Sequence, residues 1–390
     1  QVERRPRFAQ GSTLSHDQHL DMKFDFCISN PPFGTAWKDD LKALSGGSNK
    51  KEDISDPRFF HRRGYDTKQW WRFIPDVGDP QMLFLANNLS RMKDTPLGTR
   101  IVEVHNGSSL FTGNAGGGES NLRRYIIEND LLEAIIAMPE KSFYNTGIGT
   151  FIWIVTNRKE ARRRGKVQLI DATQIKSPLR KNLGEKNCET TTTDRARIVE
   201  LLTNFEETPE SRIFPNEEFG YYDIKVDRPL RLRVHPDRDL SAGKLNDKQI
   251  ATCRAALAAV PPTAPLDNWD AFAAHLGKMP KTLLLKLREL ITEVDPTCHP
   301  VAGESDKSLR DTEQVPLRYP GGVDAFLRHE VLPYAPDAYV SEEETKVGYE
   351  LSFTKYFYQP TQLRSVADIT ADLRSLESET DGLLADILDF

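Results

Sequence analysis

The feature that most constrains this chain is a ten-residue run, Phe24–Phe33, in which an apolar segment ends in Asn-Pro-Pro-Phe. A residue that precedes proline is disfavoured in the helical region, so Asn30 and Pro31 are both held toward extended geometry. Proline also fixes its own φ and carries no N–H. The run therefore predicts a β-strand that ends in a stiff loop. This loop offers a side-chain amide oxygen, backbone carbonyl oxygens and an aromatic face.

This set of groups suits one chemical task, the methylation of a planar amino group such as the exocyclic nitrogen of adenine. The Asn30 side-chain oxygen and the Pro31 carbonyl would accept hydrogen bonds from its two hydrogens, and Pro32 would keep the loop rigid. Positive charge develops on the nitrogen in the transition state, where fixed acceptor dipoles stabilise it most. Phe33 would stack on a base taken out of its duplex. The alternative is an ordinary proline-rich turn.

Composition narrows the class of protein. The 390 residues are 38% hydrophobic and 28% charged, which predicts a soluble globular protein with two or three domains. No apolar run approaches the ~20 residues of a membrane span and no signal peptide is visible, which predicts a cytoplasmic protein without a membrane partner. The four cysteines form no CxxC pair, so we expect reduced thiols and no metal site.

The pattern of apolar residues predicts an α/β protein. Helices are expected at 80–93 and at Asn121–Asn129, the second with Ser120 as its N-cap. Further strands are expected at Arg100–Val104, Leu131–Ala137, Thr150–Thr156 and Lys166–Ile170, the last at a sheet edge. Strands that alternate with helices predict a doubly wound sheet, which binds ligands at the carboxyl ends of its strands. The proline loop lies at such an end.

Three weaker signals have competing interpretations. The aromatics Trp70, Trp71 and Phe73 lie among arginines and lysines, as on a nucleic-acid surface, but an amphipathic surface segment would look the same. Asp337 with Glu344-Thr345-Lys346 imitates a metal-dependent nuclease motif. Its short separation argues against that chemistry, and so does its place in a solvated acidic run at 342–344 that is not expected to form a strand. Thr354–Tyr358 predicts short strands.

The C-terminal stretch predicts a helix from about residue 363 to 388 with an apolar seam. Seam positions recur at alternating spacings of three and four: Val366, Ile369, Leu373, Leu376, Thr380, Leu383 and Ile387. Such a heptad pattern needs a partner helix, in this chain or in another. The formal net charge of −6 argues that the chain does not wrap DNA alone, because phosphate contacts need clustered cations.

Several motifs in order resemble one family. They are Phe24–Phe33, Gly107–Gly113, Asn121–Asp130, Phe143–Gly147, Gly165–Ala172 and Gly348–Tyr358 with the terminal helix. Together they resemble the modification (M) subunit of type I restriction–modification systems. The resemblance implies a site-specific DNA adenine-N6 methyltransferase that uses S-adenosylmethionine. It assigns Asn30, Pro31, Pro32 and Phe33 to the amino group and base, and more weakly Phe143 and Tyr144 to packing against that base.

The resemblance also implies an organisation and partners. We expect an incomplete doubly wound, S-adenosylmethionine-dependent methyltransferase-like sheet at 1–175, a mixed and helical extension at 176–358, and a coiled-coil-like helix at 359–390. That helix would dock on a specificity (S) subunit, with a restriction (R) subunit as a further partner. The net charge of −6 is consistent with a partner subunit that supplies much of the DNA binding.

The departure from the family is the cofactor motif. Its glycine turn should follow a strand before Phe24, where none is present, and Gly147-Ile148-Gly149 precedes a strand instead. The family's N-terminal helical domain is missing as well. We therefore expect a C-terminal fragment that alone neither binds S-adenosylmethionine tightly nor methylates. The alternatives are a methyltransferase acting on a protein glutamine or an RNA base, and a docking module without catalysis.

Overall fold

The computed structural model describes residues 9–62, 71–144, 147–358 and 365–388. The chain divides into two compact units, Gln1–Leu351 and Ser352–Phe390. The α/β class predicted from the sequence is confirmed, and the first unit holds the loop Asn30–Phe33.

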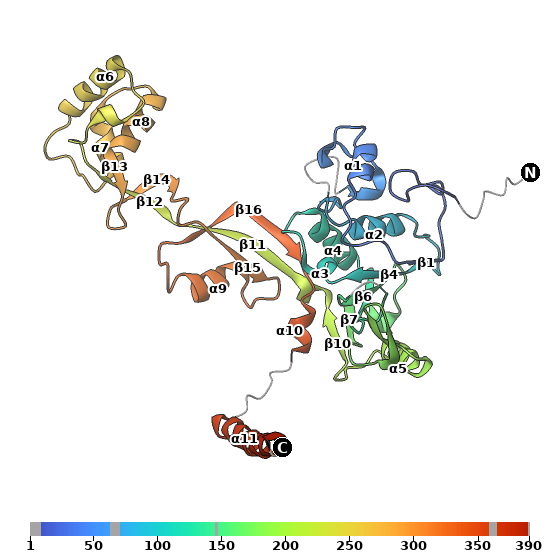
Figure 1. The fold of residues 1–390 in the computed structure, drawn as a ribbon. Helices are drawn as coiled ribbons and strands as arrows, with labels where there is room; N and C mark the ends of the chain where they lie inside the picture. Colours follow the sequence, from blue (N-terminus) through green and yellow to red (C-terminus); the bar gives the residue numbers. More distant parts are fainter. Residues whose placement is uncertain (1–8, 63–70, 145–146, 359–364, 389–390) are drawn as a thin grey trace, which may run out of the picture. The chain divides into compact units, whose positions relative to one another are not determined.

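A mixed six-stranded sheet forms the core of the N-terminal part of the first unit (Figure 1). Its order is β1 (Phe26–Ser29), β4 (Arg100–Asn106), β6 (Thr150–Thr156), β5 (Leu132–Ala137), β7 (Lys166–Asp171) and β10 (Ser211–Pro215). β1 is parallel to β4 and β5 is parallel to β7, while β6 is antiparallel to both β4 and β5. The strands β1, β4, β5 and β7 therefore all point in one direction. Their carboxyl ends share one edge of the sheet.

Helices cover the two faces of this sheet unequally. On one face, α2 (Gln81–Ser90) packs on β4 beside α4 (Gly118–Glu128). On the other face, α5 (Thr192–Asn204) buries Ile198 and Leu201 against Ile136 and Ile154. The alternation of apolar residues along the strands explains both layers, because successive side chains point to opposite faces.

Four local predictions were wrong. β7 is not at an edge, because β10, about 40 residues later in the chain, pairs with it in antiparallel register. Ser120 is not the N-cap of α4, since Gly117 is, and the buried Ser120 Oγ accepts the Tyr349 N–H at 3.1 Å. Residues 354–358 lie largely in a helix, α10 (Phe353–Phe357), in which Phe353 and Phe357 stack one turn apart with ring centroids 5.1 Å apart. The acidic run at 342–344 lies in a strand, β16 (Tyr339–Tyr349).

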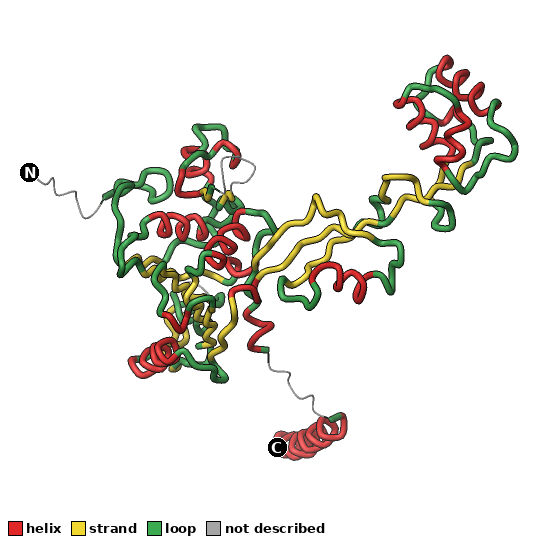
Figure 2. Tube along the Cα trace, turned by 180° about the vertical axis from the view of Figure 1, so that it is seen from behind, coloured by secondary structure: helices red, strands yellow, loops and turns green. Residues whose placement is uncertain are grey.

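A second sheet joins β16 to β11 (Gly220–Asp227) and β15 (Asp311–Pro316), the long strands of Figure 2. One fully buried arginine ties the end of β16 to α4 and the turn before it. Arg123 donates to the carbonyls of Tyr349, Ser109 and Thr112 at 2.6, 2.9 and 2.8 Å. Burial lowers the pKa of its guanidinium to about 10. Three carbonyl partners compensate for the buried charge.

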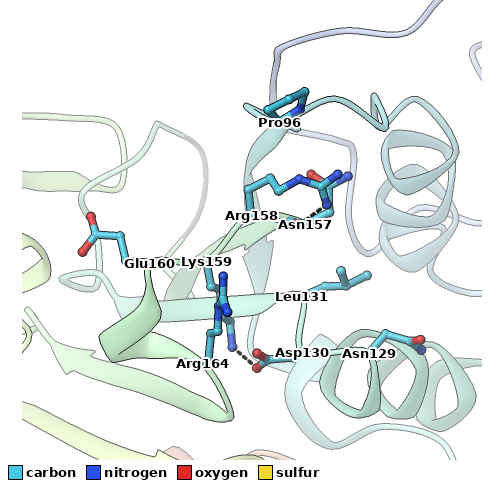
Figure 3. A pocket seen from close by; sticks show the side chains of 9 residues that line it. All are labelled: Pro96, Asn129, Asp130, Leu131, Asn157, Arg158, Lys159, Glu160 and Arg164. Atoms are coloured by element: carbon cyan, nitrogen blue, oxygen red, sulfur yellow. Dashed lines mark hydrogen bonds and ion pairs between the residues drawn. The ribbon is translucent and has the colours of Figure 1, made fainter.

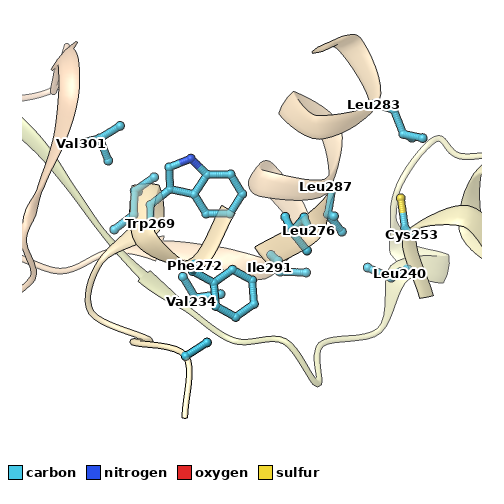
Figure 4. Close-up of a cluster of buried hydrophobic side chains, with 12 residues drawn as sticks. Val234, Leu240, Cys253, Trp269, Phe272, Leu276, Leu283, Leu287, Ile291 and Val301 are labelled. Atoms are coloured by element: carbon cyan, nitrogen blue, oxygen red, sulfur yellow. The ribbon is translucent and has the colours of Figure 1, made fainter. Parts of the chain in front are cut away.

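A small helical module is inserted in the chain between β12 (Pro229–Val234) and β13 (Thr292–Val294). These two strands form a three-stranded sheet with β14 (Pro300–Ser305). The helices of the module are α6 (Asp247–Ala258), α7 (Trp269–Ala273) and α8 (Lys281–Ile291). Their apolar faces meet around Trp269, Phe272 and Leu287 (Figure 4). Leu283, Leu287 and Ile291 form one face of α8 and are buried in this core.

The remaining elements are short or stand apart. They are α1 (Lys38–Leu44), β2 (Phe60–His61), β3 (Trp71–Arg72), α3 (Ser108–Phe111), β8 (Ser177–Leu183), β9 (Lys186–Glu189) and α9 (Gly322–Phe326). The second unit holds α10 and α11 (Val366–Leu388), so the predicted terminal helix is present. None of the helices in the described residues is long and apolar enough to cross a membrane. All four cysteines are buried free thiols, as predicted.

Candidate amine-binding loop

The loop Asn30–Phe33 follows β1 directly and lies at the edge where the parallel strands end. Pro31 is buried, Phe33 is half-buried, and Asn30 and Pro32 are exposed. The Asn30 side chain makes no hydrogen bond with any described residue, so its amide oxygen is open to a ligand. The predicted strand and the outward acceptor are thus both present. The role of these four residues in binding an amino group stays a prediction.

A buried polar network holds the residue that precedes the loop. Ser29 Oγ donates to Glu103 Oε2 on β4 at 2.9 Å. Asn88 on α2 donates to Ser29 Oγ at 3.0 Å and to Glu103 Oε2 at 2.5 Å. Glu103 is fully buried, which makes these bonds costly to remove. The loop therefore starts from a fixed point on the sheet.

The polar network continues along β4 from Glu103 to His105. A hydrogen bond also fixes Trp37, which follows the loop in the chain. Glu103 Oε1 lies 2.9 Å from Nε2 of the fully buried His105, whose ring packs on Trp153 with centroids 5.5 Å apart. The buried Trp37 donates its Nε1–H to the Asp76 carbonyl at 2.9 Å. Sequence reasoning missed Glu103 and His105. Their only signal was two polar residues on one face of an otherwise apolar strand.

Phe143 and Tyr144 follow β5 and so lie at the same edge as the loop. Phe143 is half-buried, and Tyr144 is 63% exposed with the Lys186 ammonium 5.2 Å from its ring centroid. Three strand spacings separate β1 from β5 in the sheet, a span of about 14 Å. The structure therefore brings the two predicted base contacts to one edge. The contact of Phe143 and Tyr144 with the same base as Asn30 stays a prediction.

The described residues do not fit a cofactor held by a glycine turn. None of the strands β1, β4, β5 and β7 passes into a Gly-x-Gly turn within the residues that the structure describes. The glycine cluster before α4 serves close packing instead. A Cβ on Gly118 would lie 1.9 Å from the Ile74 carbonyl oxygen. Gly147-Ile148-Gly149 precedes β6, as the sequence indicated.

A pocket of about 580 Å³ lies at the opposite edge of the sheet, around the start of β5 and the end of β6 (Figure 3). Lys159 Nζ pairs with the Asp130 carboxylate there at 2.6 Å. Burial disfavours the charged form of Asp130. Hydrogen bonds from Lys159, the Gly165 N–H and Asn216 outweigh it and hold the pKa of this carboxyl below its ordinary value. Its position separates this pocket from the amine-binding loop.

The carboxylates that imitate a nuclease motif form ion pairs within the fold. Asp337 pairs with Arg228 at 2.8 Å and with Arg231 at 3.2 Å, and Glu344 pairs with Arg310 at 2.9 Å. Carboxylates engaged in this way are not arranged as a nuclease metal site.

The arginines near Trp71 are also engaged within the fold. Arg58 pairs with Asp17 and Asp56, and Arg72 donates to backbone carbonyls. Trp70 lies outside the described residues. For Arg58 and Arg72 the structure favours the amphipathic segment over a nucleic-acid surface.

Comparison with known proteins defines the family. A family model described as N-6 DNA Methylase matches residues 3–218, more than half of the chain. The chain belongs to this family, which confirms the family predicted from the motifs.

Two curated relatives are methylase subunits of type I restriction enzymes. Over 163 residues, 42% of this chain, it is 28% identical to the type I restriction enzyme HindI methylase subunit of Haemophilus influenzae. Over 159 residues, 41% of this chain, it is 30% identical to the MjaIX methylase subunit of Methanocaldococcus jannaschii. The chain spans only 30% and 25% of the lengths of these two relatives.

A solved structure, the type I restriction–modification methyltransferase subunit of Streptococcus thermophilus, matches at 21% identity and a TM-score of 0.40. That match covers 53% of this chain and 38% of the other.

Proposed function

We propose that this chain is the amine-activating part of a modification subunit of a type I restriction–modification system, a DNA adenine-N6 methyltransferase. The observation that carries the proposal is the Asn30 loop. Within the described residues its side-chain acceptor makes no hydrogen bond. The loop lies at the carboxyl edge of the sheet and follows a strand that a buried polar network fixes. Membership of the N-6 DNA methylase family supports a DNA substrate.

The loop's part in the reaction follows from its acceptors. The Asn30 side-chain oxygen and the Pro31 carbonyl accept hydrogen bonds from the two hydrogens of the adenine amino group. This pulls the nitrogen toward tetrahedral geometry and localises its lone pair. As the nitrogen gains positive charge, the same dipoles stabilise it more strongly. Formation of the N–C bond to the methyl group would break the donor's S–C bond, and one amino proton would then be released to water. Phe33 holds the extruded base by stacking.

S-adenosylmethionine is the methyl donor that the family implies. The described residues do not supply its glycine turn, so we propose that another part of the assembled enzyme holds it. We accordingly expect this chain alone to bind the cofactor only weakly and to show no turnover. Titration calorimetry with S-adenosylmethionine tests this, and micromolar binding by the isolated chain would contradict it.

The rest of the proposal concerns organisation. We propose a methyltransferase-like doubly wound sheet within 1–175, completed by β10 from the following segment, an extension over the rest of 176–358, and a docking helix at 359–390. The side chains of Val366, Leu373 and Leu376 on α11 are 81, 61 and 58% exposed, which suits a seam that packs on a specificity subunit. A restriction subunit is a further proposed partner, and the assembly is proposed to be cytoplasmic.

The decisive experiment replaces the acceptor in the assembled enzyme, with its specificity subunit and cofactor-binding part. Asn30→Ala should lower kcat for adenine methylation by about 10²–10³, the usual cost of removing one preorganised charge-stabilising group. DNA affinity should be unchanged. The matched control is Asn129→Ala, an exposed asparagine beside the pocket at the opposite edge.

Turnover of Asn30→Ala within a few-fold of the wild type would refute the catalytic assignment. The same assay separates the alternatives. Methyl transfer to a glutamine amide or to single-stranded RNA, but not to duplex DNA, would show that the enzyme acts on a different substrate. The role of the loop in activating an amino group would remain. Absence of transfer to any of them by an assembled wild-type enzyme would leave a docking module.

A further inference from the structure

A small hairpin at the carboxyl edge carries cations that the fold itself does not use. β8 (Ser177–Leu183) and β9 (Lys186–Glu189) pair antiparallel and turn at Gly184, whose φ of +63° lies in the left-handed region. The side chains of Lys176, Arg180 and Lys181 are exposed. None of the three pairs with a carboxylate among the described residues.

The base of the hairpin is attached beside the predicted base contacts. It follows β7, and the Asn187 N–H donates to the Lys141 carbonyl at 3.0 Å. The buried Cys188 thiol donates to the Glu140 carbonyl at 3.3 Å. Lys186, the fourth cation of the hairpin segment, lies with its ammonium over the Tyr144 ring. The hairpin is thus anchored to the loop after β5, at the same sheet edge as Asn30.

The charge of the hairpin runs against that of the chain. The whole chain has a formal net charge of −6, yet residues 176–190 carry four cations and two carboxylates. Lys176, Arg180 and Lys181 lie along the first half of the hairpin, where the register of β8 with β9 shifts between Pro178 and Leu183. Exposed cations gathered at a ligand-binding edge in this way suit an anionic partner.

The sheet order sets the spacing from the amine-binding loop. Four strand spacings separate β1 from β7, or about 19 Å. At about 3.4 Å per base pair, this corresponds to five or six base pairs of B-DNA. A duplex that runs along this edge with its target base at Asn30 would carry its flanking phosphates past the hairpin.

We propose that Lys176, Arg180 and Lys181 contact the phosphate backbone of the substrate DNA, several base pairs from the methylated adenine. This rests on the proposed function, because it takes the duplex as the ligand of the edge. Contacts of this kind fix the register of the duplex without reading its sequence.

The test is the salt dependence of duplex binding by the assembled enzyme, with its specificity subunit and cofactor-binding part, measured by fluorescence anisotropy with a 20-base-pair duplex. The variant is Lys176→Ala/Arg180→Ala/Lys181→Ala. The control of equal charge is Lys248→Ala/Lys278→Ala/Lys281→Ala in the helical module, where these lysines are also exposed. The slope of log K against log salt should fall by about 0.9 for each phosphate that is no longer neutralised, and only in the hairpin variant.

Each other outcome overturns the proposal. An equal fall in slope in both variants would show a general charge effect. Unchanged DNA binding together with failure of subunit assembly would make the hairpin a protein-binding surface. An unchanged slope in the hairpin variant would also refute it. The methylation assay of Asn30→Ala in the assembled enzyme judges the DNA substrate independently.

Discussion

On the face of the six-stranded sheet that packs against α5, the strands at one end are covered, whereas β1 at the other end is exposed. Ile136 on β5 and Ile154 on β6 are 4 and 5% exposed beneath α5. The register continues this apolar row from Ile154 to Val102 on β4 and to Ile28 on β1. There the cover stops: Phe26 and Ile28 are 72 and 83% exposed. β1 also has β4 as its only strand partner among the described residues.

The difference teaches which end of the sheet carries stability and which end carries the loop proposed to bind the amino group. At the covered end, apolar burial holds the layers together. At the uncovered end, the strand that leads into Asn30 is fixed by polar bonds from Ser29 and Asn88 to Glu103. Large apolar side chains that face outward from a sheet indicate a surface suited to further packing. The amine-binding loop therefore lies at the border of such a surface.

The largest expected effect comes from truncating the covered row. Ile136→Ala should lower the free energy of unfolding by about 3 kcal/mol, because the removed atoms leave a cavity under α5. Ile28→Ala, the matched change at the other end of the row, should stay within about 0.5 kcal/mol. Urea unfolding measures both. Equal costs at the two sites would show that β1 is covered in solution and would break the comparison.

The sequence predicted the covered end better than the uncovered one. The strand at Thr150–Thr156 was predicted with the bounds that the structure shows, because a continuous apolar run between turn residues leaves few alternatives. The Asn30 loop was predictable because proline acts locally on the backbone.

Long-range features escaped prediction. The pairing of β10 with β7, the Ser120–Tyr349 bond and the Glu103 network each join residues far apart in the chain. Local pattern carries no information about which strand or loop arrives to meet such residues. The hairpin at 177–189 was missed for a related reason, since its strands are polar and lack an apolar face.

The next effect lies at the functional end. Glu103→Gln keeps the size of the side chain but replaces one acceptor oxygen with an N–H donor, so it cannot keep all its present partners. We expect about 1–2 kcal/mol lower stability, the cost of one charged hydrogen bond. In the assembled enzyme kcat should fall about tenfold, roughly 1.4 kcal/mol of transition-state stabilisation, while KM for DNA holds.

Asn88→Asp is the companion variant, because it places a second carboxylate against Glu103 in a buried site. It should lower kcat further. If both variants kept full kcat while losing stability, Glu103 would be a structural residue only, without a positioning role.

A smaller effect, dependent on pH, tests the covered end. The pKa of Asp130 is depressed in the folded chain, so its contribution to stability is complete above its ordinary value of 3.8. The contribution is lost as pH falls through the lower, folded value. Asp130→Asn should cost about 1 kcal/mol at neutral pH, discounted because the carboxylate is partly exposed. Below pH 3.8 the gap between variant and wild type should close. A gap independent of pH, in thermal unfolding at several pH values, would show that the carboxylate charge is not what stabilises this loop.

The smallest change in stability comes from charging the uncovered edge. Ile28→Lys should leave the midpoint of thermal unfolding nearly unchanged, because the side chain is already in water. An exposed apolar edge strand is a template for pairing with another chain, and an inserted lysine blocks such pairing. Wild-type chain should therefore self-associate with rising concentration in sedimentation velocity, and the variant should remain monomeric at the same concentrations. Leu97→Lys is the control, since Leu97 is 88% exposed but lies outside the strands. If both lysines suppressed association alike, added charge alone would explain the effect, and the β1 edge would lose its distinction from the rest of the exposed apolar surface.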